Sequence, residues 1–151
     1  MSFQIPESMR VEHAGIHEAL VAATREPGRV GEAARELAQI LHPHFEREEE
    51  IALPPLALLR PLAAGEYRPE MCAVLKMTDA LRAELPEMLR EHQDIAAAAR
   101  KLELTAREEA NGKVEELAKE LQLHARSEEE LFYPMAILVG DVLRARGCQE
   151  R

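Results

Sequence analysis

The chain has 151 residues, of which 46% are hydrophobic, 31% are charged and 3% are aromatic. This composition excludes disorder, and the abundance of Ala, Leu and Glu favours an all-α fold, so we expect one domain over residues 1–151. A formal net charge of −9 disfavours nucleic acid and anionic membrane surfaces as partners. Residues 1–10 lack the apolar core of a signal peptide and no stretch approaches about 20 apolar residues, so we expect a cytoplasmic protein.

Two stripes of apolar residues at helical spacing lie in the first third of the chain. One covers residues 9–23 and predicts a helix that ends at Pro27-Gly28. The other covers residues 30–51 and predicts a helix of about six turns that ends at Pro54-Pro55, where the backbone loses hydrogen-bond donors. Residues 56–68 are apolar and then punctuated by Gly and Pro, so a short helix and a connecting loop are expected there.

Two further stripes follow in the second half of the chain. A stripe over residues 85–102 predicts a helix that begins near Glu70 and is kinked or interrupted at Pro86. After the turn signal Asn111-Gly112, the last stripe consists of Leu117, Leu121, His124, Glu128, Leu131, Met135 and Leu138. Pro134 marks a bend or a break into a terminal helix. The sequence therefore predicts an up-down-up-down four-helix bundle with short extra helices after the second and fourth helices.

The two halves of the chain repeat each other. Counting 80 positions on from Leu37, Leu41, His44, Glu48, Ile51 and Pro54 gives Leu117, Leu121, His124, Glu128, Leu131 and Pro134. Counting 79 positions on from Met9, Glu12, His13 and Ile16 gives Met88, Glu91, His92 and Ile95. The chain is therefore predicted to be a duplicated helix pair, about residues 7–55 and 70–135, with approximate two-fold symmetry.

Polar residues interrupt the apolar stripes at matching places in both halves. His44 and Glu48 are four residues apart and therefore project from one helix face, as do His124 and Glu128. Because these residues occupy core register, they are expected to be buried, and an unpaired buried carboxylate would destabilise the bundle by several kcal/mol. A cation at the centre would remove this cost.

His13 and His92, on the remaining two helices, complete a set of four imidazoles and two carboxylates, which is more than one ion needs. If each carboxylate bridges two metals, two small coordination sets result, with positions left for an exogenous small molecule. Imidazole and carboxylate suit iron, zinc, copper or manganese, and two open six-coordinate sites favour iron.

Four segments carry a resemblance to a known family: EHAGI (12–16), HFEREEEIALP (44–54), EHQDI (91–95) and HARSEEELFYP (124–134). With these motifs the chain resembles the haemerythrin-like family, also called the HHE cation-binding domain, from about Met9 to Pro134. The resemblance implies a non-haem di-iron centre, with two iron ions and an oxo or hydroxo bridge, that binds dioxygen or responds to nitric oxide or oxidative stress. Carried over residue by residue, the ligands would be His13, His44, Glu48, His92, His124 and Glu128.

Two departures from the family pattern concern the ligands. Oxygen-carrying haemerythrins have a fifth histidine one turn after the third-helix ligand, where this chain has Ala96. By the internal symmetry His17, four residues after His13, would supply the missing ligand, or else it is a boundary histidine facing water. The carriers also use an aspartate with different spacing in the last helix, whereas this chain has Glu in both halves.

Other residues near the motifs have structural interpretations. His42 is expected on the surface, and Tyr133 is expected to pack near a helix end, the alternative being a hydrogen bond to the site. Cys72 and Cys148 form no CxxC pair and are expected to be free thiols. Solvated faces are expected for Glu49, Glu50, Glu129 and Glu130, with Glu49 or Glu129 as an alternative ligand if a helix rotates.

These features predict a non-haem di-iron protein that binds dioxygen or nitric oxide for sensing, storage or stress response. A ligand set rich in nitrogen and poor in carboxylate, unlike that of oxygen-activating ferritin-like bundles, favours binding over catalysis. The alternatives are a di-iron enzyme that consumes peroxide or reduces nitric oxide, and iron storage or donation for the repair of iron centres. A small diatomic ligand is the expected partner, and the sequence names no protein partner.

Overall fold

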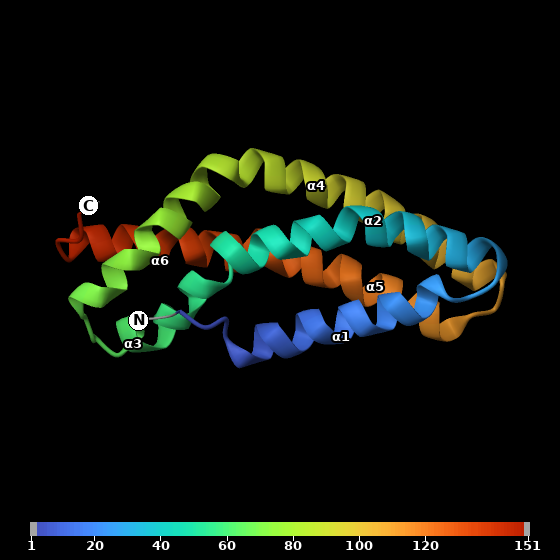
Figure 1. Cartoon of the computed structure of the whole chain (residues 1–151), viewed down its shortest axis with the longest axis horizontal. Coiled ribbons are helices and arrows are strands. Elements are labelled where there is room, and N and C mark those ends of the chain that lie inside the picture. Colours follow the sequence, from blue (N-terminus) through green and yellow to red (C-terminus); the bar gives the residue numbers. More distant parts are fainter. Residues whose placement is uncertain (1–2, 150–151) are drawn as a thin grey trace.

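The fold is a four-helix bundle. A computed structural model describes residues 3–149, and this range contains no strand. The long helices are α1 (Glu7–Thr24), α2 (Gly28–Ile51), α4 (Leu75–Glu108) and α5 (Gly112–Ser127). They run up and down in turn, and the α1–α2 and α4–α5 connections lie at the same end of the bundle (Figure 1). The predicted all-α, up-down-up-down architecture is confirmed.

Local sequence signals set the ends of the helices. Gly28 has φ +68°, a conformation that glycine adopts without strain, and it turns the chain from α1 into α2. The side chain of Asn111 accepts a hydrogen bond from the backbone N–H of Val114 at 3.2 Å and so caps the start of α5. The helix α2 ends at Ile51, shortly before Pro54-Pro55, as the loss of backbone donors predicts.

Short helices follow α2 and α5, as predicted. After α2 come η1 (Pro54–Leu58), α3 (Leu59–Ala63) and η2 (Pro69–Val74), and after α5 come η3 (Glu128–Phe132) and α6 (Tyr133–Ala145). The helix α4 passes through Pro86 without an interruption, and Figure 1 shows that it is bent, as expected where proline removes a helical hydrogen bond. The region from Glu70 to Val74, predicted as the start of this helix, is instead 3₁₀-helical.

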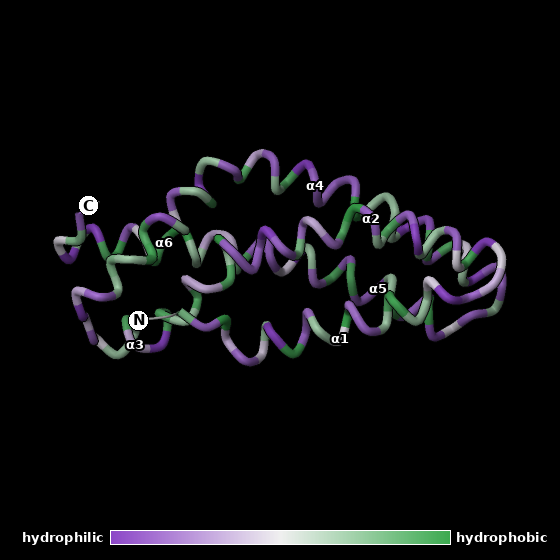
Figure 2. The backbone as a smooth tube through the Cα atoms, viewed as in Figure 1, coloured by the Kyte–Doolittle hydropathy of each residue, from purple (hydrophilic) through white to green (hydrophobic). Residues whose placement is uncertain are grey.

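Apolar side chains fill the bundle on both sides of a central polar layer. Figure 2 shows hydrophobic and hydrophilic residues alternating along each helix, as amphipathic packing requires. The layer toward the inter-helix turns includes Ile16, Leu41, Phe45, Ile95 and Leu121. The layer toward α6 includes Met9, Ile51, Leu53, Met88 and Tyr133. Among residues 3–149, no helix combines the length and the hydropathy that a membrane crossing requires.

The apolar stripe predicted beyond Glu128 is wrong in its register. Leu131 and Leu138 are 53% and 57% exposed, although both were expected in the core. The reason is that η3 is a π-helix, in which the backbone N–H of Tyr133 donates to the carbonyl of Glu128, five residues earlier. This extra residue in the turn rotates the helix that follows, and the inward residues become Tyr133, Ala136, Val139, Gly140 and Leu143.

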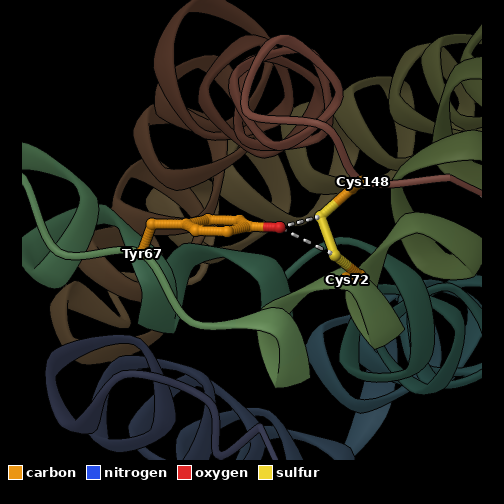
Figure 3. Close-up of a disulfide and its surroundings, with 3 residues drawn as sticks. All are labelled: Tyr67, Cys72 and Cys148. Carbon is orange, nitrogen blue, oxygen red and sulfur yellow. Dashed lines mark hydrogen bonds between the residues drawn. A yellow bond between two sulfur atoms is a disulfide. The ribbon is translucent and has the colours of Figure 1, made fainter.

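The prediction that both cysteines are free thiols is also wrong. Cys72 in η2 and Cys148 after α6 form a disulfide, with 5.4 Å between their Cα atoms, and the Tyr67 hydroxyl lies 3.6 Å from both sulfur atoms (Figure 3). The two cysteines are 76 residues apart, and no local motif indicates a disulfide between two such distant segments, so the sequence does not predict it. The bridge fastens the end of α6 to the segment that leads into α4.

Replacing both cysteines with serine should lower the free energy of unfolding by about 2–4 kcal/mol, because the bridge closes a long loop in the unfolded chain. For a domain of this size the loss corresponds to a fall in Tm of about 5–15 °C, measurable by circular dichroism. Reducing the wild-type protein with a thiol should reproduce the shift. An oxidised wild type that melts together with the double variant would contradict the expectation.

Candidate metal centre

Six inward side chains from the four long helices and η3 converge at the middle of the bundle. These side chains are at most 3% exposed and belong to His13, His44, Glu48, His92, His124 and Glu128. The i, i+4 spacing places His44 above Glu48 on α2, and it places His124 at the end of α5 above Glu128 at the start of η3. The structure thus brings together every residue of the predicted ligand set except His17.

The ligand atoms fall into two groups that share one residue. One group consists of His44, Glu48, His92 and Glu128, the other of His13, His124 and Glu128, and the ligand atoms within each group lie within 4.8 Å of one another. Glu128 Oε1 lies 3.5 Å from His92 Nε2, whereas Glu128 Oε2 lies 3.5 Å from His13 Nε2 and 3.4 Å from His124 Nε2. Glu128 therefore faces both groups, one oxygen to each.

Each of the four imidazoles also faces a glutamate on a neighbouring helix through its Nδ1 atom. His44 Nδ1 is 2.6 Å from Glu91 and His92 Nδ1 is 2.9 Å from Glu129. His124 Nδ1 pairs with Glu12, whereas His13 Nδ1 has Glu49 at 3.8 Å and no hydrogen-bond partner within the described residues. A carboxylate that accepts the Nδ1 proton fixes the tautomer and leaves Nε2 free to bind a metal.

These four glutamates obey the same duplication as the imidazoles, with Glu12 and Glu91 before one pair of histidines and Glu49 and Glu129 after the two inward glutamates. Both pairs are visible in the sequence, but no local pattern there indicates an orienting role. Glu49 and Glu129 were expected to be solvated or to replace a ligand, whereas they are half-exposed and face the outer nitrogen of an imidazole. The repeat of their positions at matching offsets was the signal that could have found this role.

Replacing Glu91 with alanine should weaken metal binding by about 10- to 100-fold, because the His44 ring would lose the acceptor that holds its orientation. Glu87→Ala removes an exposed glutamate of the same helix that pairs with the nearby Arg90, and it should leave the affinity unchanged. Competition with a chromophoric chelator measures both affinities. Equal affinities for the two variants would contradict the orienting role.

The Tyr133 hydroxyl enters the larger group from α6. Its oxygen donates to Glu48 Oε2 at 3.1 Å and lies 3.3 Å from His44 Nε2 and 3.0 Å from His92 Nε2. Burial and the charges of Glu48 and Glu128 raise the pKa of this phenol well above its ordinary value. Tyr133 packs in the apolar layer at the start of α6, as expected, and its hydroxyl also makes the hydrogen bond to the site that was the alternative expectation.

The electrostatics of the metal-free centre show how the buried carboxylates are compensated by protons. Burial alone would lower the pKa of His44, but Glu48 and Glu91 outweigh it and raise that pKa to about 9. Burial also lowers the pKa of His124, but Glu128 and Glu12 outweigh this effect and raise the pKa of His124 to about 9. Burial and the charge of Glu128 raise the pKa of Glu48 to about 7.

The metal-free protein should lose stability as pH rises from 6.5 through about 9. In this range His44 and His124 bind more protons in the folded state than in the unfolded state, so the slope of unfolding free energy against pH is negative. Below pH 6.5 the lowered pKa values of His13 and His92 have the opposite effect, because these two residues bind fewer protons in the folded state and so favour greater stability as pH rises. Urea unfolding at several pH values measures the slope, and a metal-free protein that grows more stable over this range would contradict it.

His17 and His42 lie away from the centre. Both are exposed, on α1 and α2, and their ring centroids are 6.2 Å apart. His17 follows His13 by one helical turn, but its side chain is exposed whereas that of His13 is buried. His17 is therefore outside both ligand groups, and the surface position expected for His42 is observed.

Two buried carboxylate oxygens fit a metal better than they fit a hydrogen bond. Glu48 Oε1 is 3.1 Å from His44 Nε2, and Glu128 Oε2 is 3.4–3.5 Å from two imidazole nitrogens, yet neither oxygen has a hydrogen-bond partner within the described residues. Buried polar atoms without partners are costly, and a cation between the oxygens and the nitrogens would satisfy both. The donor set therefore suits a bound metal ion.

Comparison with protein families agrees with this chemistry. The profile described as the Hemerythrin HHE cation binding domain matches residues 4–136. The chain belongs to the HHE family. Searches of curated proteins and of solved structures found no significant match. The matched range of the HHE domain contains all six inward His and Glu residues and Tyr133, and it ends within α6.

Proposed function

We propose that this HHE protein binds two iron ions and uses them to hold dioxygen or nitric oxide for sensing, storage or stress response. The proposal rests on the position of Glu128. One of its oxygens faces His92 and the other faces His13 and His124, as expected of a carboxylate that bridges two ions. Four imidazoles with two carboxylates suit iron. When bound, a pair of iron ions supplies two adjacent redox-active centres to which a diatomic molecule can attach.

The two groups offer unequal numbers of protein donors. Four side chains form one group, and three form the other, which consists of His13, His124 and the shared Glu128. An ion with fewer protein donors keeps more positions for an exogenous ligand. The proposed position of the diatomic molecule is therefore on the side of His13 and His124.

A surface pocket of about 490 Å³ between α1 and α5 supports this position, because His124 and Glu12 are among its lining residues. Gly15 also lines the pocket, and among the described residues no atom outside its own stretch of helix lies within 4 Å of the point where a Cβ would be. Val11 and Leu123, both largely exposed, give the pocket apolar walls. It is the proposed route by which a small apolar molecule approaches the centre.

The residues around the centre support binding rather than turnover. The apolar layer that contains Ile16, Leu41 and Leu121 excludes water on one side of the polar residues. Proton delivery to a bound dioxygen molecule is slow in such surroundings, so the molecule is not lost readily as peroxide. Orientation of the imidazoles by the outer glutamates keeps the donor set fixed when the exogenous ligand enters and leaves.

Anaerobic loading with ferrous iron, followed by exposure to air or nitric oxide, tests the proposal. We expect two irons per chain by elemental analysis, and near-ultraviolet and visible charge-transfer bands that disappear when the gas is removed. Continuous consumption of peroxide or nitric oxide would indicate an enzyme instead. Rapid loss of all iron to a chelator would indicate storage or donation, and a chain that accepts no transition metal would refute the proposal.

A further inference from the structure

The hydroxyl of Tyr133 lies among the atoms of the larger group, His44, Glu48, His92 and Glu128, that would hold a metal. Three ligand atoms surround the phenol oxygen at 3.0–3.3 Å: His92 Nε2, Glu48 Oε2 and His44 Nε2. These are the metal-binding nitrogens of the two imidazoles, because their Nδ1 atoms face Glu91 and Glu129. The phenol therefore approaches the inner side of the group.

These separations match those between neighbouring ligands of one ion. With metal–ligand bonds of about 2.1 Å, two ligand atoms at right angles around an octahedral ion lie about 3.0 Å apart. The separation of His44 Nε2 from Glu48 Oε1, two residues of the ligand set, is 3.1 Å. The phenol oxygen is thus spaced from His44, Glu48 and His92 as a further corner of the same coordination polyhedron would be.

Hydrogen bonding alone does not satisfy this arrangement once the imidazoles bind a metal. A phenol has one proton, which it donates to Glu48. The Nε2 lone pairs of His44 and His92 would then point to the metal and could accept nothing from Tyr133. The lone pairs of the phenol oxygen would face the same cation, and a nearby cation favours the ionised form of an oxygen ligand.

We propose that the Tyr133 oxygen is a direct ligand of the ion held by His44, Glu48, His92 and Glu128. The inference rests on the proposed di-iron function. Coordination forms one metal–oxygen bond, breaks the phenol O–H bond and releases one proton to solvent, and no electron is transferred.

The duplication restricts this ligand to one ion of the pair. Counting 80 positions back from Tyr133 gives Leu53, which is fully buried and whose backbone N–H likewise bonds to the carbonyl five residues earlier, that of Glu48. The side chain of Leu53 has no atom that binds a metal. The two ions would therefore differ in their ligands, one with phenolate and one without.

Resonance Raman spectroscopy of the ferric protein tests the proposal, because phenolate bound to ferric iron gives a visible charge-transfer band that enhances the ring vibrations. The chain has two tyrosines, Tyr67 and Tyr133, so the Tyr67→Phe variant leaves Tyr133 as the only source of these vibrations. We expect this variant to show them, and we expect them to shift when the protein is made with ring-deuterated tyrosine. Tyr133→Phe should lose the visible band and still bind two irons.

The outcomes separate this proposal from the proposed function. Two irons per chain in the Tyr67→Phe protein, with a spectrum insensitive to tyrosine deuteration, would show that Tyr133 only donates a hydrogen bond, and would overturn this proposal alone. A chain that takes up no iron would overturn both. If Tyr133→Phe fails to fold, the isotope shift in the Tyr67→Phe protein still decides the question.

Discussion

Replacing Glu128 with glutamine should weaken metal binding by more than about 100-fold and leave fewer than two metal ions per chain. The reason is that Glu128 is the residue shared by both ligand groups, with one oxygen toward His92 and the other toward His13 and His124. An outer residue that only orients a ligand costs about 10- to 100-fold when it is removed, so a residue that contributes to both ions should cost more. Elemental analysis after gel filtration measures the metal content.

Glu130→Gln is the matched control for this experiment. It makes the same chemical change two residues away, on the exposed side of η3, and it should retain the wild-type metal content. Glu48→Gln should lose at least one ion. Full metal content in Glu128→Gln would show that the two groups do not share this carboxylate as a ligand.

Removing the metal should lower Tm on the order of 10 °C. A ligand that binds only the folded state stabilises it by about 4 kcal/mol when its free concentration is 1,000 times Kd, and each kcal/mol moves Tm by about 2–4 °C in a domain of this size. In the metal-free centre one oxygen of each of the two buried carboxylates lacks a hydrogen-bond partner within the described residues, a cost that the bound metal removes.

Differential scanning calorimetry of the chelator-treated and reloaded protein measures this difference. The disulfide must stay oxidised in both samples, because its reduction would lower Tm by a separate route. Glu128→Gln offers a further control, since adding metal should hardly raise its Tm. Identical melting of metal-free and loaded wild type would contradict a buried metal centre.

The four long helices and the six inward His and Glu side chains could be predicted because both follow from spacing. An apolar period of three to four residues marks a helix face, and His44 and His124 occupy the same place on that face in both halves. The turns at Gly28 and Asn111 were also readable, since each depends on the conformational preference of its own residue.

The features that sequence reasoning missed depend on contacts between distant segments or on a change of helical period. A π-helix adds one residue to a turn, so extending the ordinary period past Glu128 placed Leu131 inward and did not place Tyr133 on the inward face. The Cys72–Cys148 disulfide joins segments that only the folded chain brings together. Internal symmetry misled for His17, because the one-turn step that it suggested ends in solvent.

The position of α6 affects how the protein can open. A terminal helix outside a bundle is ordinarily the first part to fray, but α6 is held at its start by Tyr133 in the polar layer and beyond its end by Cys148. Between these points Arg82 pairs with Asp141, and Arg144 pairs with Asp79 on α4. Partial opening of α6 therefore requires the loss of tertiary contacts at both ends, and we expect the helix to unfold together with the four-helix bundle.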